Sequence, residues 1–112
     1  MNTLDPERVQ EILALPNQPY RLKQTVQVTT ITLAELLDTH LPSGQVIDFL
    51  NVDVELRDLE VLRSNNWSKY RPQVVLVECD RGESPVHQYL RVFGYQETAR
   101  TLRTSIFQLP EN

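Results

Sequence analysis

The junction between a strand pattern and a helix pattern at residues 47–62 constrains the fold more than any other part of the chain. Residues 47–55 are predicted to form a strand, in which apolar and polar residues alternate from Leu50 to Glu55. From Leu56 onward apolar residues recur at helical spacing, which predicts a helix to about residue 64. In open α/β sheets ligands bind at the carboxyl ends of the strands. A strand that ends in acids and turns directly into a helix therefore places those acids at the rim of a candidate site.

The patterns on either side continue this alternation of helices and strands. Helices are predicted over 5–15, 33–40 and 85–93, strands over 21–31 and 74–79, and a pair of strands over 95–102 and 104–109. The strand at 74–79 is almost entirely apolar, as a buried parallel strand is. We therefore predict an α/β fold with parallel strands, helices and a C-terminal antiparallel hairpin.

Composition narrows the classes of partner. The chain has 112 residues, enough for one small domain, and a net charge of −4 that favours neither nucleic acid nor an anionic membrane surface. No apolar run approaches the ~20 residues of a membrane span. The N-terminus lacks the layout of a signal peptide, and the single cysteine, Cys79, leaves no cluster for zinc. These features predict a cytoplasmic protein with no nucleic-acid or membrane partner.

The junction also carries a family resemblance. Asp-Phe-Leu-Asn-Val-Asp-Val-Glu at 48–55, followed by Asp-Leu-Glu-Val-Leu at 58–62, resembles the C-terminal half of FkbM-type methyltransferases, which use S-adenosylmethionine. The segments at 30–37, 71–78, 94–95 and 104–107 resemble the family in the same order and spacing, so that the likeness covers about 26–109. One position departs from the pattern: the family usually has Gly directly after Asp-Val-Glu, and this chain has Leu56.

The resemblance implies a single methyltransferase-like domain over 1–112, with an N-terminal helix and linker at 1–25 and part of a class I (Rossmann-like) sheet. It implies transfer of a methyl group from S-adenosylmethionine to an oxygen of a small molecule or sugar. A cofactor site of this kind needs a Gly-rich turn after a strand. The three glycines, Gly44, Gly82 and Gly94, are too far apart for one. We therefore expect a truncated domain that lacks the cofactor-binding half and is inactive alone.

Three acids are the candidate catalytic residues. Asp53 and Glu55 project from the same side of the strand at 47–55, and Glu78 ends the next strand at the same rim. The alternative is that Asp53 and Glu55 only stabilise the positive end of the following helix. His87 is a weaker candidate because no acid at fixed spacing orients it. The sequence identifies no cofactor-binding residue and no metal-ligand spacing.

The missing half has a structural consequence. Without its neighbour the strand at 47–55 becomes a sheet edge, which needs to be covered. We expect a homodimer or a partner chain to cover it, although the segment at 21–31 or the N-terminal helix is an alternative. Two other functions stay open: a non-catalytic remnant that self-associates or binds a partner, and one half of a split enzyme.

Overall fold

A computed structural model describes residues 6–79 and 82–111, apart from the side chain of Arg8. The chain divides into two units, Met1–Thr30 and Ile31–Asn112, which we describe separately.

The first unit contains one helix, α1 (Pro6–Ala14). Pro6 occupies the first helical position, where its missing N–H costs nothing, and Ile12 is the buried residue of the apolar stripe. The helix predicted over 5–15 is confirmed, although its first predicted residue, Asp5, lies outside the described residues.

The strand predicted over 21–31 is wrong, because residues 18–32 form neither helix nor strand. The physical reason is that an extended segment becomes a β-strand only when a neighbouring strand accepts and donates its backbone hydrogen bonds. Residues 20–31 are exposed along their whole length.

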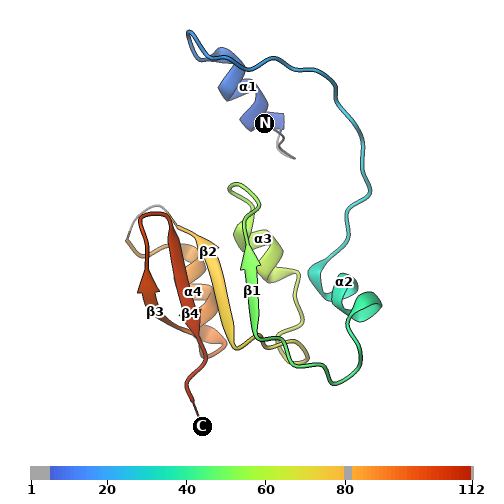
Figure 1. Cartoon of the computed structure of the whole chain (residues 1–112), viewed down its shortest axis with the longest axis vertical. Coiled ribbons are helices and arrows are strands. Elements are labelled where there is room, and N and C mark those ends of the chain that lie inside the picture. Colours follow the sequence, from blue (N-terminus) through green and yellow to red (C-terminus); the bar gives the residue numbers. More distant parts are fainter. Residues whose placement is uncertain (1–5, 80–81, 112) are drawn as a thin grey trace. The chain divides into compact units, whose positions relative to one another are not determined.

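The second unit is built on a four-stranded mixed sheet (Figure 1). Its strands are β1 (Phe49–Val52), β2 (Val74–Glu78), β3 (Gln96–Arg100) and β4 (Thr104–Gln108), in the spatial order β1-β2-β4-β3. The pair β1–β2 is parallel, and β4 runs antiparallel to both β2 and β3. This confirms the prediction of parallel strands with an antiparallel C-terminal hairpin, in which β3 becomes the outer strand. The strand predicted over 47–55 is shorter, because its ladder with β2 ends at Val52.

Three helices belong to this unit: α2 (Leu33–His40), α3 (Asp58–Arg63) and α4 (Pro85–Val92). The helices predicted over 33–40 and 85–93 are confirmed, and the one predicted from Leu56 begins two residues later. Leu33 and Ala34 at the start of α2 donate their N–H groups to the side chain and backbone of Ser64, at 2.9 and 3.1 Å. At the other end of α2, Asp38 accepts hydrogen bonds from Lys69 and Tyr70.

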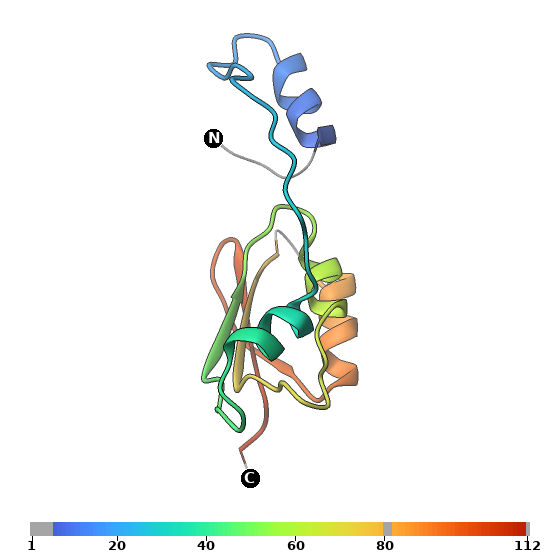
Figure 2. The same cartoon turned by 90° about the vertical axis from the view of Figure 1, so that its right-hand side faces the viewer.

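The core lies between the sheet and the helices α3 and α4, which cover the same face of it (Figure 2). Val75 and Val77 of β2 point to this face and are fully buried, in register with Leu50 and Val52 of β1. Trp67 closes one end of the core. Its ring stacks on Phe93 and meets Tyr95 edge-on, both with centroids 5.5 Å apart, and its Nε1–H donates to the carbonyl of Leu62.

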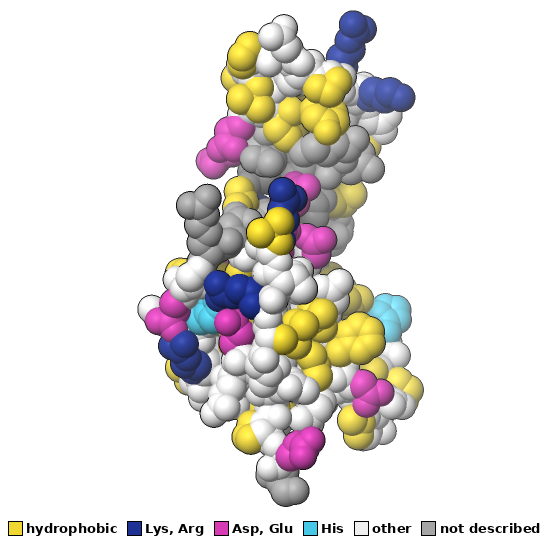
Figure 3. Space-filling view, turned by 60° about the vertical axis from the view of Figure 1, so that its left-hand side comes forward, with side chains coloured by type: hydrophobic (Ala, Val, Ile, Leu, Met, Phe, Trp, Pro, Cys, Tyr) yellow, Lys and Arg dark blue, Asp and Glu magenta, His cyan; other side chains and the backbone are white. Residues whose placement is uncertain are grey.

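None of the described helices of this unit covers the other face of the sheet (Figure 2). The register places Phe49 beside Val74 and Leu76 beside Ile106 on this face. Phe49 is 65% exposed, and the other three are half-buried by their neighbours in the sheet. Figure 3 shows hydrophobic side chains gathered on this side of the unit. Such a face is unusual for parallel strands, which are commonly covered on both sides.

None of the described helices is both long enough and apolar enough to cross a membrane.

Candidate functional site

The three predicted acids lie at the carboxyl ends of two parallel neighbours. Asp53 and Glu55 follow β1, and Glu78 is the last residue of β2. Because β1 and β2 run side by side in the same direction, these positions share one edge of the sheet (Figure 1). Asp53 and Glu78 are exposed, whereas Glu55 is half-buried. The structure thus brings to one rim the residues that the sequence proposes.

The turn after β1 has an unusual backbone. Glu55 and Leu56 both have positive φ, 43° and 65°, in the left-handed region that L-residues other than Gly, Asn and Asp rarely enter. Leu56 stands where FkbM-type sequences usually have Gly, and its side chain is 78% exposed. A leucine in this conformation lowers the free energy of unfolding, and its mostly exposed side chain offsets little of that loss. The conformation itself is therefore retained although the residue best suited to it is absent.

The same turn holds an unsatisfied carboxylate oxygen. Oε2 of Glu55 is shielded from solvent and has no hydrogen-bond partner among the described residues. A shielded carboxylate oxygen without a donor is costly in a folded protein, and such groups call for an explanation. Strained backbone and unpaired polar atoms both occur preferentially at functional sites.

Asp58 fixes the turn from the helix side. Its Oδ1 accepts the N–H of Val54 at 3.0 Å, so the first residue of α3 is tied back to the end of the strand. Burial raises the pKa of Asp58, the bond from Val54 lowers it, and the negative charge of Asp53 raises it further. Sequence reasoning missed this residue because its partner is a backbone group that only the folded turn presents.

A second polar cluster surrounds His87, near the start of α4. The imidazole is 3% exposed. On one side, its Nδ1 accepts the backbone N–H of Ser84 at 3.1 Å and lies 2.9 Å from Ser84 Oγ. On the other side, Nε2 lies 2.5 Å from Oε2 of Glu97. Because Nδ1 accepts a hydrogen bond from an N–H, the proton of the neutral ring belongs on Nε2, facing Glu97.

A β-bulge brings the acid to this histidine. Glu97 pairs with Phe107 and Arg100 with Ser105, with a register shift between Glu97 and Ala99. Residues three apart on a regular strand point to opposite faces, but the extra residue turns both side chains to the helix-covered face. There, Arg100 Nη2 lies 2.9 Å from Glu97 Oε2 and 2.8 Å from the carbonyl of Gly82. The expectation that no acid orients His87 is therefore wrong, because the orienting acid comes from another strand.

Charge pairing controls the ionisation of Glu97. Desolvation raises its pKa, but the hydrogen bonds from Arg100 and His87 outweigh that effect and bring the pKa to about 2. The carboxylate is thus ionised at neutral pH, and its Oε2 accepts hydrogen bonds from both Arg100 and His87. The ring of His87 also meets Phe107 edge-on, with centroids 5.0 Å apart. This cluster joins α4 to the hairpin, and both nitrogens of the histidine are already occupied.

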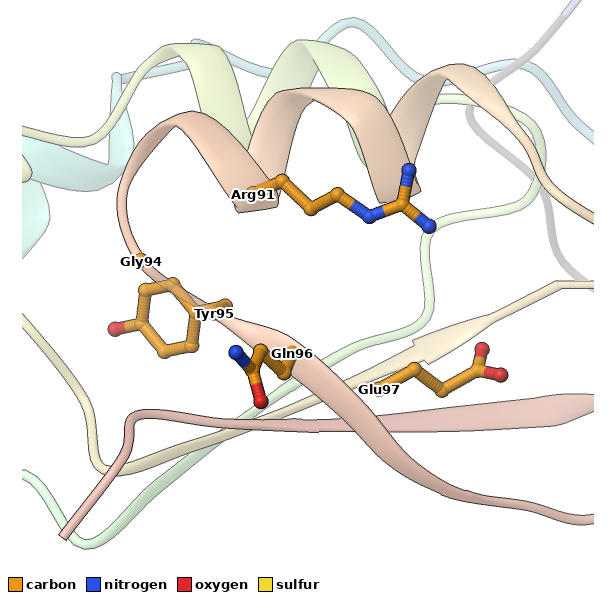
Figure 4. Close-up of a pocket in the computed structure, with 5 residues that line it drawn as sticks. All are labelled: Arg91, Gly94, Tyr95, Gln96 and Glu97. Carbon is orange, nitrogen blue, oxygen red and sulfur yellow. The ribbon is translucent and has the colours of Figure 1, made fainter.

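An open hollow lies between α4 and β3 (Figure 4). It is lined by Arg91, Gly94, Tyr95, Gln96 and Glu97. Arg91 forms an ion pair with Glu83, and Glu97 is held by His87, so the charged groups at this hollow are already paired. None of the three predicted acids lines it. Cys79, the single cysteine, is buried, with its sulfur 3.9 Å from Ser84 Oγ.

The described residues hold no cluster of three or more His, Cys, Asp or Glu side chains that is suited to a metal ion.

Comparison with known proteins identifies the family. The model of the methyltransferase FkbM domain matches residues 2–97 of the 112-residue chain. This match begins earlier in the chain than the resemblance over about 26–109, and it also ends earlier. Neither a curated protein nor a solved structure matches the chain. Because the family model spans most of the sequence, including β1, β2 and the acids at their carboxyl ends, the chain belongs to the FkbM methyltransferase domain family.

Proposed function

We propose that this chain supplies the acceptor side of an FkbM-type methyltransferase site, with Asp53, Glu55 and Glu78 facing the bound ligands. The observation that carries the proposal is the turn at Glu55–Leu56, which keeps a left-handed backbone and a shielded, unpaired carboxylate oxygen. A carboxylate in this state is ready to accept a hydrogen bond from a ligand hydroxyl. Methyl transfer to oxygen requires that the accepting hydroxyl lose a proton, and an adjacent carboxylate is suited to receive it.

Family membership suggests S-adenosylmethionine as the methyl donor. The residues of this chain fit only one side of a site for that cofactor. Gly44, Gly82 and Gly94 all have positive φ, but they lie in three separate turns, and none follows β1 or β2 as part of a Gly-rich loop. We therefore assign no cofactor-binding residue, and we propose that this chain is inactive by itself.

Titration calorimetry with S-adenosylhomocysteine tests the cofactor part of the proposal. We expect no binding tighter than about 100 μM, which corresponds to roughly 5–6 kcal/mol. Binding tighter than this that is lost in Asp53→Asn or Glu55→Gln would overturn the proposal that the chain is inactive by itself. It would make the chain an enzyme in its own right. Glu35→Gln is the matched control, because Glu35 is an exposed acid on a different helix, α2.

A stability measurement tests the role of Glu55 without any ligand. Removing the charge from a shielded carboxylate that lacks a partner is expected to leave the domain as stable or to stabilise it. Glu97→Gln provides the contrast, since Glu97 is held by His87 and Arg100 and its loss is expected to destabilise. If Glu55→Gln destabilised the domain as much as Glu97→Gln, Glu55 would be a structural residue.

The second candidate function is a non-catalytic domain that persists as a folded binding module, and the third is one half of a split enzyme. Leu56 at a left-handed position favours a site released from catalytic constraint. A neighbouring reading frame that encodes a strand followed by a Gly-rich turn would favour the split enzyme. Restored binding of S-adenosylhomocysteine on mixing the two chains would then separate it from the binding module.

A further inference from the structure

We propose that two copies of this chain exchange strands, with residues 24–31 of each copy adding to the free edge of β1 in the other. This exchange uses backbone pairing at the outer edge of β1 and involves no methyl transfer. It does not depend on whether the acids at the carboxyl ends of β1 and β2 are catalytic.

The receiving surface is the outer edge of β1. This strand pairs with β2 on one side, and the described residues provide no strand on its other side. Within residues 49–52 there is no Pro, Lys or bulge, and Phe49 is 65% exposed, so this edge is limited only by its short length and by the acids that flank it. An open edge of this kind presents backbone donors and acceptors that only another extended chain satisfies fully.

The inserted element is a segment that has the sequence of a strand but forms none. Apolar residues recur at Tyr20, Leu22, Val26 and Val28, with polar residues between them, which is the period of a strand with one apolar side. β-branched residues fill most of 25–31. Yet the segment has no ladder, and Val26 and Val28 are 60% and 63% exposed. The segment therefore has the sequence pattern of a strand, but the described residues of one copy provide no neighbouring strand for it to pair with.

Charge selects this segment over a second β1 strand as the occupant. Residues 46–55 carry Asp48, Asp53 and Glu55 and no basic residue, a charge of −3. Two such edges placed together would repel. Residues 20–31 carry Arg21 and Lys23 and no acid, a charge of +2. Arg21 and Lys23 precede the inserted residues 24–31, and the three acids flank β1, so the charges that border the proposed contact are opposite in sign.

Exchange between two copies satisfies both elements at once. Each copy has one outer edge of β1 and one unpaired segment among its described residues, so a two-fold exchange fills both β1 edges and uses both segments, while β3, the other edge strand of the sheet, takes no part. Exchange of an identical element is also a low-cost route to a dimer, because the contacts require no surface that a single copy does not already carry.

The first experiment measures mass and protection together. Size-exclusion chromatography with light scattering is expected to show a dimer at about 100 μM, and hydrogen exchange is expected to show protected amides at 24–31. On dilution, the protection and the dimer should disappear together. A monomer at about 100 μM, a dimer with unprotected 24–31, or protection that persists in the monomer (addition within one chain) would each overturn the exchange.

Charge reversal tests the complementarity. The double variant Arg21→Glu, Lys23→Glu is expected to weaken the dimer by about tenfold or more, because it places like charges at both copies of the contact. Adding Asp48→Lys and Asp53→Lys to the same chain should restore it. Arg103→Glu, an exposed reversal in the hairpin turn, changes the net charge by the same two units as Lys23→Glu alone; it is the control for that single variant and should leave dimerisation unchanged. Weakening without restoration would overturn the assigned contact, provided that circular dichroism shows all variants folded.

Discussion

The left-handed turn at Leu56 gives the most direct test of the structure. Replacing Leu56 by Gly removes a backbone strain of about 1–2 kcal/mol. Two costs oppose this gain: about 0.4–1 kcal/mol because glycine makes the unfolded chain more flexible, and about 0.4 kcal/mol of lost burial, a fifth of the roughly 2 kcal/mol for a fully buried Leu. With Leu56 78% exposed, we expect a net stabilisation of about 0.5 kcal/mol.

The matched control is Leu102→Gly. Leu102 lies in the hairpin turn, is 88% exposed and has no positive φ. The same substitution there brings the costs without relief of strain, so it should destabilise by about 1 kcal/mol. The two variants are therefore expected to differ by about 1.5 kcal/mol, or roughly 6–12 °C in melting temperature for a domain of this size.

Urea and thermal unfolding followed by circular dichroism would measure this difference. Both variants remove the same side chain, so the comparison cancels most of the error in the estimates of entropy and burial. If Leu56→Gly destabilised the protein as much as Leu102→Gly does, residue 56 would not be left-handed in solution, and the turn would not be strained.

Three further predictions concern the core and the histidine cluster. The pKa of Glu97 falls from 4.5 to about 2 on folding, so this carboxylate stabilises the fold above about pH 4.5 and the contribution is lost as pH falls toward 2; in Glu97→Gln the stability should change less over this interval, and an unchanged acid slope would refute the pairing with His87. Trp67→Ala should cost about 3–5 kcal/mol in urea unfolding, whereas Trp67→Phe, which keeps a ring against Phe93, should cost clearly less. Tyr95 donates its hydroxyl to the carbonyl of Pro72 at 2.6 Å, and burial raises its pKa to about 12; Tyr95→Phe should cost about 1 kcal/mol, and ultraviolet titration of the folded protein should show one tyrosine that ionises near pH 12.

The sequence predicted the elements whose signals are local. Ser84-Pro85 marked the start of α4 and Gly94 its end, and the continuous apolar run marked β2. The strand–helix junction at 47–62 was correct in kind, although the strand ended earlier and the helix began later than the pattern suggested. The end of β1 depends on where its hydrogen bonds with β2 stop, at Val52. The sequence of β1 alone does not determine that point.

The failures have the same origin. Residues 21–31 alternate as a strand does, but a strand also requires an edge to pair with, and no local pattern records whether one is present. His87 lacked a visible acid because Glu97 reaches it only through a bulge that puts residues three apart on one face. The sequence offered one related signal, an acid and a base three residues apart at Glu97 and Arg100. On a regular strand these two side chains would point to opposite faces, so the spacing would have argued against their lying together beside His87.

The order of the strands also governs how the domain can form. β4 is the last of the described strands, yet it lies between β2 and β3 and makes the strand pairing that joins the hairpin to the parallel pair. A ribosome that has released everything up to Arg100 has exposed β1, β2 and the helices around them, but the sheet cannot close. The nascent chain therefore holds an incomplete, apolar sheet until residues 104–108 emerge, which makes the emergence of β4 the step at which this domain is most dependent on protection from aggregation.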